Sequence, residues 1–334
     1  MATTATIQIL DLRHFGAPML RPVLEVESEL WMQRLHWDYR ASSRLLMQYL
    51  DNHMLPGYAA LDAGAVTGYT FCVYEQTKAV IGDVFATRAL APGEDAGDPP
   101  AQAVEETLLT HLFETLLNSP QLDRIESQLL LHPAGTHANA FRDAGFQLFR
   151  RLFMVLSLSG SPPRAQADLP PELEMRPWRE EDLNPSARLI SMAYADHPDS
   201  RINDQYHSIH GSTRFLNNIV RYSGCGVFAS QASHVIVHRI TRELAGLVLA
   251  SRVSPQSGHI TQLCIHPEYR RQGMARRLLA AAAAQFLRMN IREISLTVTE
   301  DNRDAVTLYR SEGYRTQHTF DAAVWQRGSK RFQS

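Results

Sequence analysis

Short apolar runs alternate with helix-spaced apolar positions along the first half of the chain. The runs lie between turn residues such as Asp62-Ala63-Gly64, a pattern typical of strands. They predict strands at residues 5–12, 57–61, 66–74, 79–86 and 124–131, and a closing strand region at 146–158. Apolar positions three and four residues apart predict helices at residues 18–29, 39–53, 102–117 and 136–144. The first half is therefore expected to be a mixed α/β domain.

The second half repeats this order of elements. Its predicted strands are residues 172–177, 233–240, 245–253, 259–265, 293–299 and a region after Tyr314. Its predicted helices are residues 181–194, 212–222, 272–289 and 302–312. Aligning Gly313-Tyr314 with Gly145-Phe146 superposes the last helices of the two halves, which indicates an internal repeat. We predict two domains, 1–158 and 172–334, joined by a proline-rich linker at 159–171.

A basic turn at residues 267–275 joins the strand at 259–265 to the long helix. The unpaired N–H groups of a helix N-terminus point in one direction, and the helix dipole adds partial positive charge there. Gly273 lets the main chain approach a ligand closely, and Ala275 keeps the next contact small. Four arginines surround the turn: Arg270, Arg271, Arg276 and Arg277. The turn is therefore predicted to bind an anion such as a phosphate.

The turn also matches a known motif, together with a second element further along the chain. The turn contributes Arg270-x-x-Gly273-x-Ala275 directly after a strand. The second element is Leu296-Thr-Val298, followed by Asn302-x-x-Ala305-x-x-Leu308-Tyr309-x-x-x-Gly313-Tyr314. In this order, the two elements resemble the acetyl-CoA-binding core of the GCN5-related N-acetyltransferases, the GNAT superfamily. A plain basic surface turn would account for the arginines but not for the second element.

The resemblance implies a fold and an activity. Each domain would be a mixed, mostly antiparallel sheet flanked by helices, with a central β-α-β unit that binds acetyl-CoA. The chain would be an acetyl-CoA-dependent N-acyltransferase with two tandem GNAT domains, active in the C-terminal one. The acetyl group would pass directly to a primary amine in a sequential mechanism, without a covalent enzyme intermediate.

The resemblance also implies which residues hold acetyl-CoA. In this family the strand before the turn splays from the next parallel strand, and the pantetheine arm adds to its open edge. These main-chain contacts fall on Leu263, Cys264 and Ile265. The pyrophosphate contacts fall on Arg270, Arg271, Gln272, Gly273, Met274, Ala275 and Arg276. Asn302 resembles the residue that steadies the pantetheine arm, and it would also serve as a plain helix N-cap.

Two residues are predicted to move protons. Tyr309 corresponds to the family tyrosine that stands near the sulfur atom as general acid; a core tyrosine beside Leu308 is the alternative. His259 lies where the family often has a glutamate as general base, and a histidine titrates in the right range. The alternatives are that His259 is an ordinary polar surface residue, that Gln262 positions a water, or that Glu300 or a main-chain carbonyl takes the proton.

A long polar segment at residues 196–206 separates two predicted helices, and in this fold such a segment commonly covers the acceptor cleft. Its candidates for substrate contact are Arg201, Asn203, Asp204 and Tyr206. A solvated connection between helices is the alternative. The tandem arrangement with one altered copy also resembles mycothiol synthase-type enzymes, so one expected acceptor is a small amine or amino-sugar conjugate, and a peptide or protein amine is the other.

The first half differs at the positions that the chemistry requires. Phe141 falls opposite Tyr309, and Ala134 falls opposite Asn302. The loop at 91–100, opposite the arginine-rich turn, carries three carboxylates: Glu94, Asp95 and Asp98. Because carboxylates repel a pyrophosphate, we predict that the first copy is a degenerate domain that serves as a scaffold or as part of the acceptor cleft. A second acyl-CoA site with an unusual loop is the alternative.

The composition and the net charge exclude some of the other classes of function. A net charge of −2 and a pI near 6.7 argue against nucleic-acid binding by bulk charge. Cys72, Cys225 and Cys264 lie in apolar runs, which suits reduced thiols in a cytoplasmic protein, and no apolar run reaches the roughly 20 residues of a membrane span. No metal site is predicted, and acetyl-CoA is the one expected co-substrate. The protein is expected to be a monomer or a homodimer. The alternative functions are an acyl-CoA sensor without turnover and a structural protein that only uses the fold.

Overall fold

The computed structural model describes residues 7–87, 101–158, 168–222 and 226–328. The predicted loop at 91–100, most of the predicted linker at 159–171 and Cys225 lie outside these residues. The chain divides into two compact units. The first contains Met1–Leu35, Tyr39–Arg150 and Phe320–Ser334, and the second contains His36–Asp38 and Arg151–Thr319. Each unit therefore includes a segment from the other half of the chain.

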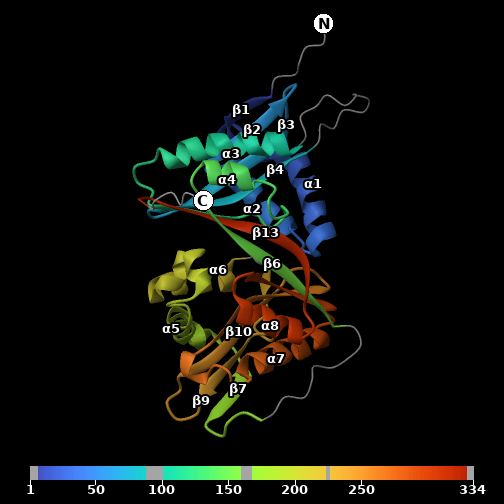
Figure 1. The fold of residues 1–334 in the computed structure, drawn as a ribbon. Coiled ribbons are helices and arrows are strands. Elements are labelled where there is room, and N and C mark those ends of the chain that lie inside the picture. The colour runs from blue at the N-terminus through green and yellow to red at the C-terminus, as the bar shows by residue number, and fades with distance from the viewer. Residues whose placement is uncertain (1–6, 88–100, 159–167, 223–225, 329–334) are drawn as a thin grey trace. The chain divides into compact units, whose positions relative to one another are not determined.

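The first unit is a mostly antiparallel sheet with helices on both faces (Figure 1). Its strands, in spatial order, are β1 (Gln8–Asp11), β2 (Gly57–Asp62), β3 (Ala65–Glu75), β4 (Lys78–Ala86), β5 (Arg124–Gln128) and the end of β13 (Arg315–Gln326). Only β4 and β5 are parallel. One face packs against α1 (Ala17–Leu35) and α2 (Arg40–Asp51), and the other packs against α3 (Ala101–Leu117) and α4 (Ala138–Asp143).

Side chains that alternate along the strands build a core on each face of this sheet. In β2, Ala59 belongs to the core under α1 and α2, whereas Ala60 belongs to the core under α3. Because both faces are buried, the strands show nearly continuous apolar runs in the sequence. Helix α1 runs beyond its predicted end at residue 29, since Trp31 and Leu35 continue its buried side.

The second unit has the same order of strands and helices. Its strands, in spatial order, are residues 151–157 of β6 (Gln147–Ser157), β12 (Glu293–Thr299), β11 (Ser257–Ile265), β10 (Leu244–Arg252), β9 (His234–His238) and β7 (Leu173–Pro177), with β8 (Val227–Phe228) beside β10. Only β11 and β12 are parallel. One face packs against α5 (Leu183–Ala193) and α6 (Ile209–Arg221), and the other packs against α7 (Met274–Arg288) and α8 (Arg303–Ser311). The predicted fold class is confirmed.

The compact units differ from the predicted domain boundaries at three places, one of which is His36–Asp38 in the second unit. Residues 151–157 pair with β12 in the second unit, where Arg151 stands opposite Thr299. The end of β13 pairs with β5 in the first unit, where Ala323 stands opposite Ser127. A local pattern cannot predict this exchange, because an apolar strand carries no mark of the half of the chain with which it will pair.

The two parallel pairs end early and at equivalent points. Strand β11 pairs with β12 only as far as Ile260, and a bulge in β11 follows directly at Thr261. Strand β4 pairs with β5 only as far as Ile81, and a bulge in β4 follows directly at Gly82. Within the described residues, the rest of β4 and of β11 has a strand partner along one edge only, so each unit has an open strand edge at this point.

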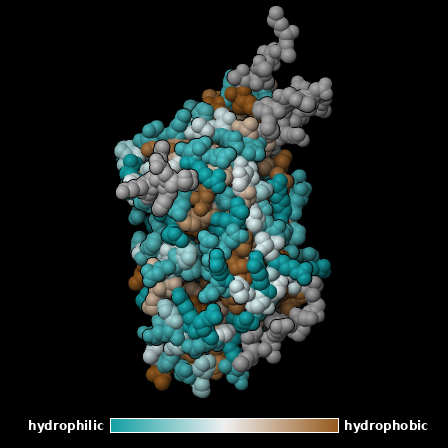
Figure 2. All heavy atoms as spheres, in the orientation of Figure 1, coloured by the Kyte–Doolittle hydropathy of each residue, from teal (hydrophilic) through white to brown (hydrophobic). Residues whose placement is uncertain are grey.

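The face of the molecule seen in Figure 2 is mainly hydrophilic, with apolar side chains in small groups. Single exposed apolar residues, such as Ile240 in the turn between β9 and β10, are common on protein surfaces. In the part of the chain that the structure describes, no helix combines the length and the apolar character needed to cross a membrane.

Candidate functional site

Beyond its bulge, β11 has one edge paired with β10 and one open edge. Cys264 and His266 direct their main-chain groups toward β10, where the N–H of His266 donates to the carbonyl of Ala245 over 2.9 Å. Successive residues of a strand direct these groups to opposite edges, so those of Leu263 and Ile265 face the open edge. Of the three residues predicted to bind the pantetheine arm, two therefore present main-chain groups to that edge, and Cys264 is engaged with β10.

The carbonyl groups of Leu263 and Ile265 each have a distant side-chain donor. The Tyr194 hydroxyl lies 3.5 Å from the Leu263 oxygen, and Arg270 Nε lies 3.4 Å from the Ile265 oxygen. Hydrogen bonds of this length are weak and are readily exchanged for a better partner. Burial raises the pKa of the Cys264 thiol, which stays protonated at neutral pH and is therefore a poor nucleophile.

The turn after β11 shapes the start of α7. A 3-10 segment, Pro267–Tyr269, precedes Arg271 and Gly273, whose φ angles of 63° and 78° lie in the left-handed region. A side chain at Gly273 would meet no atom within 4 Å, so conformation rather than crowding favours glycine there. Met274 begins α7 and is buried, Ala275 is half-buried, and the first N–H groups of the helix lack intrahelical partners. This geometry suits an anion.

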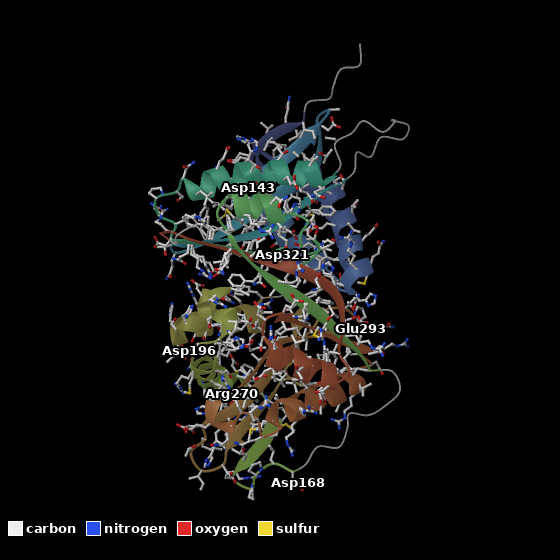
Figure 3. All side chains as sticks on the ribbon, viewed as in Figure 1. Asp143, Asp168, Asp196, Arg270, Glu293 and Asp321 are labelled. Carbon is white, nitrogen blue, oxygen red and sulfur yellow. The ribbon has the colours of Figure 1, made fainter. Side chains whose placement is uncertain are left out.

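Most side chains predicted to bind the pyrophosphate have partners inside the protein. Arg270, labelled in Figure 3, donates to the carbonyl of Ala193 over 2.8 Å and so ties the end of α5 to β11. Arg271 lies 3.5 Å from a carboxylate of α8, and Arg276 lies 2.9 Å from a carboxylate that follows α8. Gln272 donates to a main-chain carbonyl of the turn over 3.1 Å. An anion at this turn would therefore rely mainly on main-chain N–H groups.

Helix α8 begins with the predicted N-cap. Asn302 Oδ1 accepts a hydrogen bond from the N–H of Ala305 over 3.2 Å, and Asn302 Nδ2 lies 3.0 Å from His197 Nε2. Two turns along, the Tyr309 ring is 8% exposed and its centroid lies 5.8 Å from that of Tyr314. Burial raises the pKa of the Tyr309 hydroxyl, which therefore keeps its proton at neutral pH.

A hydrogen-bonded network that the sequence did not predict lies at the end of β12. Arg151 on β6 donates to Thr299 Oγ1 and to Thr297 Oγ1, each over 3.2 Å. The Thr299 hydroxyl donates to the Asp199 carboxylate, which lies 3.8 Å from Arg151 Nη1. After burial, Asp199 raises the pKa of Tyr309 and Arg151 lowers it. Both charges therefore act on the hydroxyl that is the candidate general acid.

Sequence reasoning missed Arg151 because it comes from the first half of the chain. The available signal was an arginine inside an otherwise apolar strand, since a buried charge requires a partner. His197 and Asp199 lie in the polar segment 196–206, but the candidates chosen there were later residues.

The predicted acceptor residues have different surroundings. Arg201 is exposed and Asp204 is half-buried. Asn203 caps the second of two short 3-10 segments, and the Tyr206 ring packs with its centroid 4.5 Å from that of Tyr194. Asn203 and Tyr206 therefore have structural roles in this segment.

His259, the candidate base, is buried in the paired part of β11. Its Nδ1 lies 2.9 Å from the hydroxyl of Ser295, which donates its own proton to the carbonyl of Gly258. Nδ1 therefore carries the imidazole proton, and Nε2 carries the lone pair. The ring centroid lies 5.0 Å from that of Trp37 and 6.3 Å from that of Phe153. Burial lowers the pKa of His259 to about 4, so the imidazole is neutral at pH 7.

In the first unit, side chains already occupy the equivalent open edge. His132 Nε2 lies 2.8 Å from the carbonyl oxygen of Val84, and Glu105 Oε1 accepts from the N–H of Ala86 over 3.1 Å. Phe141, which the repeat sets opposite Tyr309, is buried in the core under α3 and has no proton to give. The edge of β4 therefore has close protein partners, whereas the carbonyl groups at the edge of β11 have only distant side-chain donors.

Comparison with known sequences gives matches over part and over most of the chain. Residues 204–323 match the family model of the acetyltransferase (GNAT) domain. A mycothiol acetyltransferase from Geodermatophilus obscurus is 27% identical over 323 residues, which cover 93% of this chain and 90% of that protein.

Solved structures match the whole fold. A GCN5-related N-acetyltransferase from Sphaerobacter thermophilus superposes with a TM-score of 0.65 at 13% identity, over 96% of this chain and 95% of that one. The tandem GNAT protein from the clavulanic acid biosynthesis pathway superposes with a TM-score of 0.59 at 14% identity, over 97% of this chain and 100% of that one. Residues 204–323 therefore resemble an acetyltransferase (GNAT) domain, and the chain has the fold of a tandem GNAT protein.

Proposed function

We propose that the protein transfers the acetyl group of acetyl-CoA to a primary amine of a small molecule, directly and in its second unit. The observation that carries this proposal is the open edge of β11, which leads through the left-handed turn at Gly273 to the N-terminus of α7. Acetyl-CoA has amide groups near the thioester and a pyrophosphate further along. An open strand edge followed by an anion-binding helix N-terminus matches that order.

The main chain does most of the binding in this proposal. Leu263 and Ile265 hydrogen-bond the amides of the pantetheine arm, and an N–H group of this edge polarises the acetyl carbonyl. The N–H groups of residues 272–276 bind the pyrophosphate, and Asn302 steadies the arm from the start of α8. Cys264 contributes a small, protonated side chain, in keeping with direct transfer rather than an acyl-cysteine intermediate.

Tyr309 serves as the general acid. As the carbon–sulfur bond breaks, the departing thiolate takes the proton of the Tyr309 hydroxyl, which burial has kept in place. The charge of Asp199 disfavours the phenolate that remains, and the positive charge of Arg151, held in position by Thr299 and Asp199, offsets part of that effect.

His259 serves as the general base, directly or through a water, by way of its Nε2 lone pair. A pKa of about 4 gives it the basicity of a carboxylate, the group that the family often uses at this point. An alkyl ammonium group has a pKa of about 10.4, so the enzyme must bind the amine in the small neutral fraction or move its proton away.

The first unit has no part in the chemistry in this proposal. Its equivalent strand edge is engaged by His132 and Glu105, and Phe141 cannot act as an acid. The similarity to a mycothiol acetyltransferase over most of both chains favours a small-molecule amine over a protein as the acceptor.

The test is release of free thiol from acetyl-CoA by the purified full-length protein, measured against a panel of small primary amines and, in parallel, lysine-containing peptides. The proposal predicts saturable stimulation by at least one small amine and an intersecting initial-rate pattern in both substrates, as sequential transfer requires. Slow hydrolysis of acetyl-CoA that no amine stimulates would instead favour the acyl-CoA sensor.

A further inference from the structure

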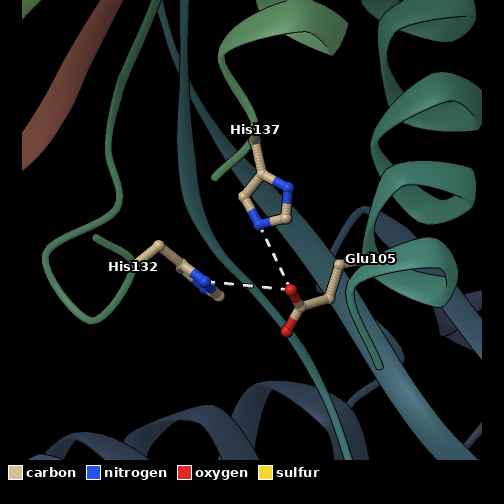
Figure 4. A group of neighbouring side chains, drawn as sticks. All are labelled: Glu105, His132 and His137. Carbon is tan, nitrogen blue, oxygen red and sulfur yellow. Dashed lines mark ion pairs between the residues drawn. The ribbon is translucent and has the colours of Figure 1, made fainter. Parts of the chain in front are cut away.

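Three side chains from separate segments of the first unit converge on one point (Figure 4). Glu105 comes from α3, His132 from the segment after β5, and His137 from the position before α4. Glu105 Oε2 lies 3.2 Å from His137 Nε2 and 3.8 Å from His132 Nδ1, and these three atoms lie within 4.8 Å of one another. Glu105 and His137 are 6% and 5% exposed, so the convergence is inside the unit.

In His132 and Glu105, the atom that faces away from the cluster is hydrogen-bonded to the main chain of β4. The carbonyl oxygen of Val84 can only accept, so His132 Nε2, 2.8 Å away, carries the proton and Nδ1 directs a lone pair toward Glu105. Glu105 Oε1 accepts from the N–H of Ala86, which leaves Oε2 facing the two histidines. Metal ligands are commonly oriented in this way, by a hydrogen bond to the atom that does not bind the metal.

His137 gives an independent indication of a ligand. Its ring is buried, yet neither of its nitrogens forms a hydrogen bond. Nε2 nevertheless points at the carboxylate of Glu105, as Figure 4 shows. A buried nitrogen without a hydrogen bond is costly, and a metal ion bound at Nε2 would remove that cost for this atom.

Other carboxyl groups lie near this cluster. Burial raises the pKa of Glu27 and of Asp83, and the charge of Glu105 raises both further, so a cation bound at Glu105 would lessen the cost of having three carboxyl groups close together inside the unit.

The same corner of the fold carries opposite charge in the two units. Matching the last residues of α3 and α7, Leu117 and Arg288, sets Glu105 opposite Arg276, one of the arginines around the predicted anion site. A carboxylate and two imidazoles in place of positive charge indicate a cation rather than a pyrophosphate as the ligand of the first unit.

We propose that Glu105, His132 and His137 bind one divalent transition-metal ion, zinc by preference. Two imidazoles and a carboxylate are a known ligand set for zinc, with a fourth position left to water or another ligand. Ligand atoms about 2.1 Å from a tetrahedral ion are about 3.4 Å apart, and the observed 3.2 and 3.8 Å lie on either side of that value. The ion joins α3 to the segment before α4. No metal site was predicted from the sequence, because the three ligands are too widely spaced to form a compact motif.

The test uses full-length protein without a histidine tag, stripped with a chelator and then titrated with zinc chloride against a chromophoric competitor. The proposal predicts one tight site. His132→Ala and His137→Ala should each weaken it by more than the roughly 10- to 100-fold that loss of an outer-shell partner costs. His111→Ala, which removes a half-buried histidine of α3 outside the cluster, is the matched control and should bind as wild type does.

Glu105→Gln tests the same point without removing the side chain, because its amide oxygen can still accept from the N–H of Ala86. It should bind zinc more weakly and should lose the increase in melting temperature that zinc gives to wild type. No saturable binding to wild-type protein, or equal affinity in wild type and Glu105→Gln, would overturn the proposal. Acetyl transfer is not a readout here, so the result is independent of the proposed function.

Discussion

Ile81 and Ile260 occupy equivalent points in the two units. Each is the last residue of its strand to pair with the following parallel strand, and each is followed directly by a bulge. The splayed strand is thus present twice, while its open edge differs. In the second unit Leu263 and Ile265 face it, whereas in the first unit His132 and Glu105 have filled it. The two units therefore share the strand geometry, but in the first unit side chains occupy the open edge.

Tyr309→Phe should lower kcat by roughly 10²- to 10⁴-fold, the usual contribution of a general acid. The ring stays buried against Tyr314, so acetyl-CoA affinity and melting temperature should change little. Steady-state kinetics and direct binding measurements check this. Tyr314→Phe, which removes a neighbouring buried hydroxyl, is the control and should retain most of the activity. A Tyr309→Phe enzyme with wild-type kcat would exclude Tyr309 as the acid.

Arg151→Met should lower the free energy of unfolding by about 2–4 kcal/mol, because it leaves the half-buried Asp199 beside Thr299 without its cation. The measurement is chemical denaturation. Arg150→Met is the matched control, since that neighbour lies half-exposed on the same strand and should cost less than about 1 kcal/mol. Equal losses in the two variants would argue against the network.

The buried His259 predicts a pH dependence of stability. Its pKa is about 4 in the folded protein and 6.5 when unfolded. Above pH 6.5 both states are neutral; as the pH falls from 6.5 to 4 only the unfolded state gains the proton, so stability is lost. Relative to His259→Gln, wild type should lose about 3 kcal/mol over this range, measured by denaturation at several pH values. Parallel curves for the two proteins would show that the imidazole is not buried in the neutral form.

The pKa of His259 also predicts how kcat depends on pH in the acidic range. If His259 takes the proton from the amine complex, the acid limb of log kcat should fall near pH 4 rather than near 6.5, and His259→Ala should remove or shift it. A limb near 6.5 that survives in His259→Ala would assign the base to another residue.

Much of the fold could be predicted from the sequence because strand runs, helix spacing and the glycine turn are local signals. The order of elements and the turn at Gly273 before α7 follow from such patterns, and the mostly antiparallel sheet was implied by the resemblance to the GNAT superfamily. Arg151 could not be assigned to the site, since its partners depend on which strands pair across the chain. The cluster of Glu105 with His132 and His137 was not predicted because the three residues are too widely spaced in the sequence to form a motif.

The sequence also did not predict which groups inside the protein the motif side chains would contact. Arg270 matches the motif, yet its guanidinium ties α5 to β11. The motif match identified Arg270 as part of the turn, but only the packing of α5 shows that its guanidinium binds the carbonyl of Ala193.

The central claim, one acetyl-CoA site in the second unit, is tested most directly by calorimetric titration of full-length protein with acetyl-CoA. The account predicts one site in wild type. Gly273→Glu should weaken it by about 100-fold or more, because a carboxylate would face the pyrophosphate. Gly64→Glu, at an equally open left-handed glycine in the turn between β2 and β3, should bind as wild type does. Unchanged binding in Gly273→Glu, or two sites in wild type, would contradict the account.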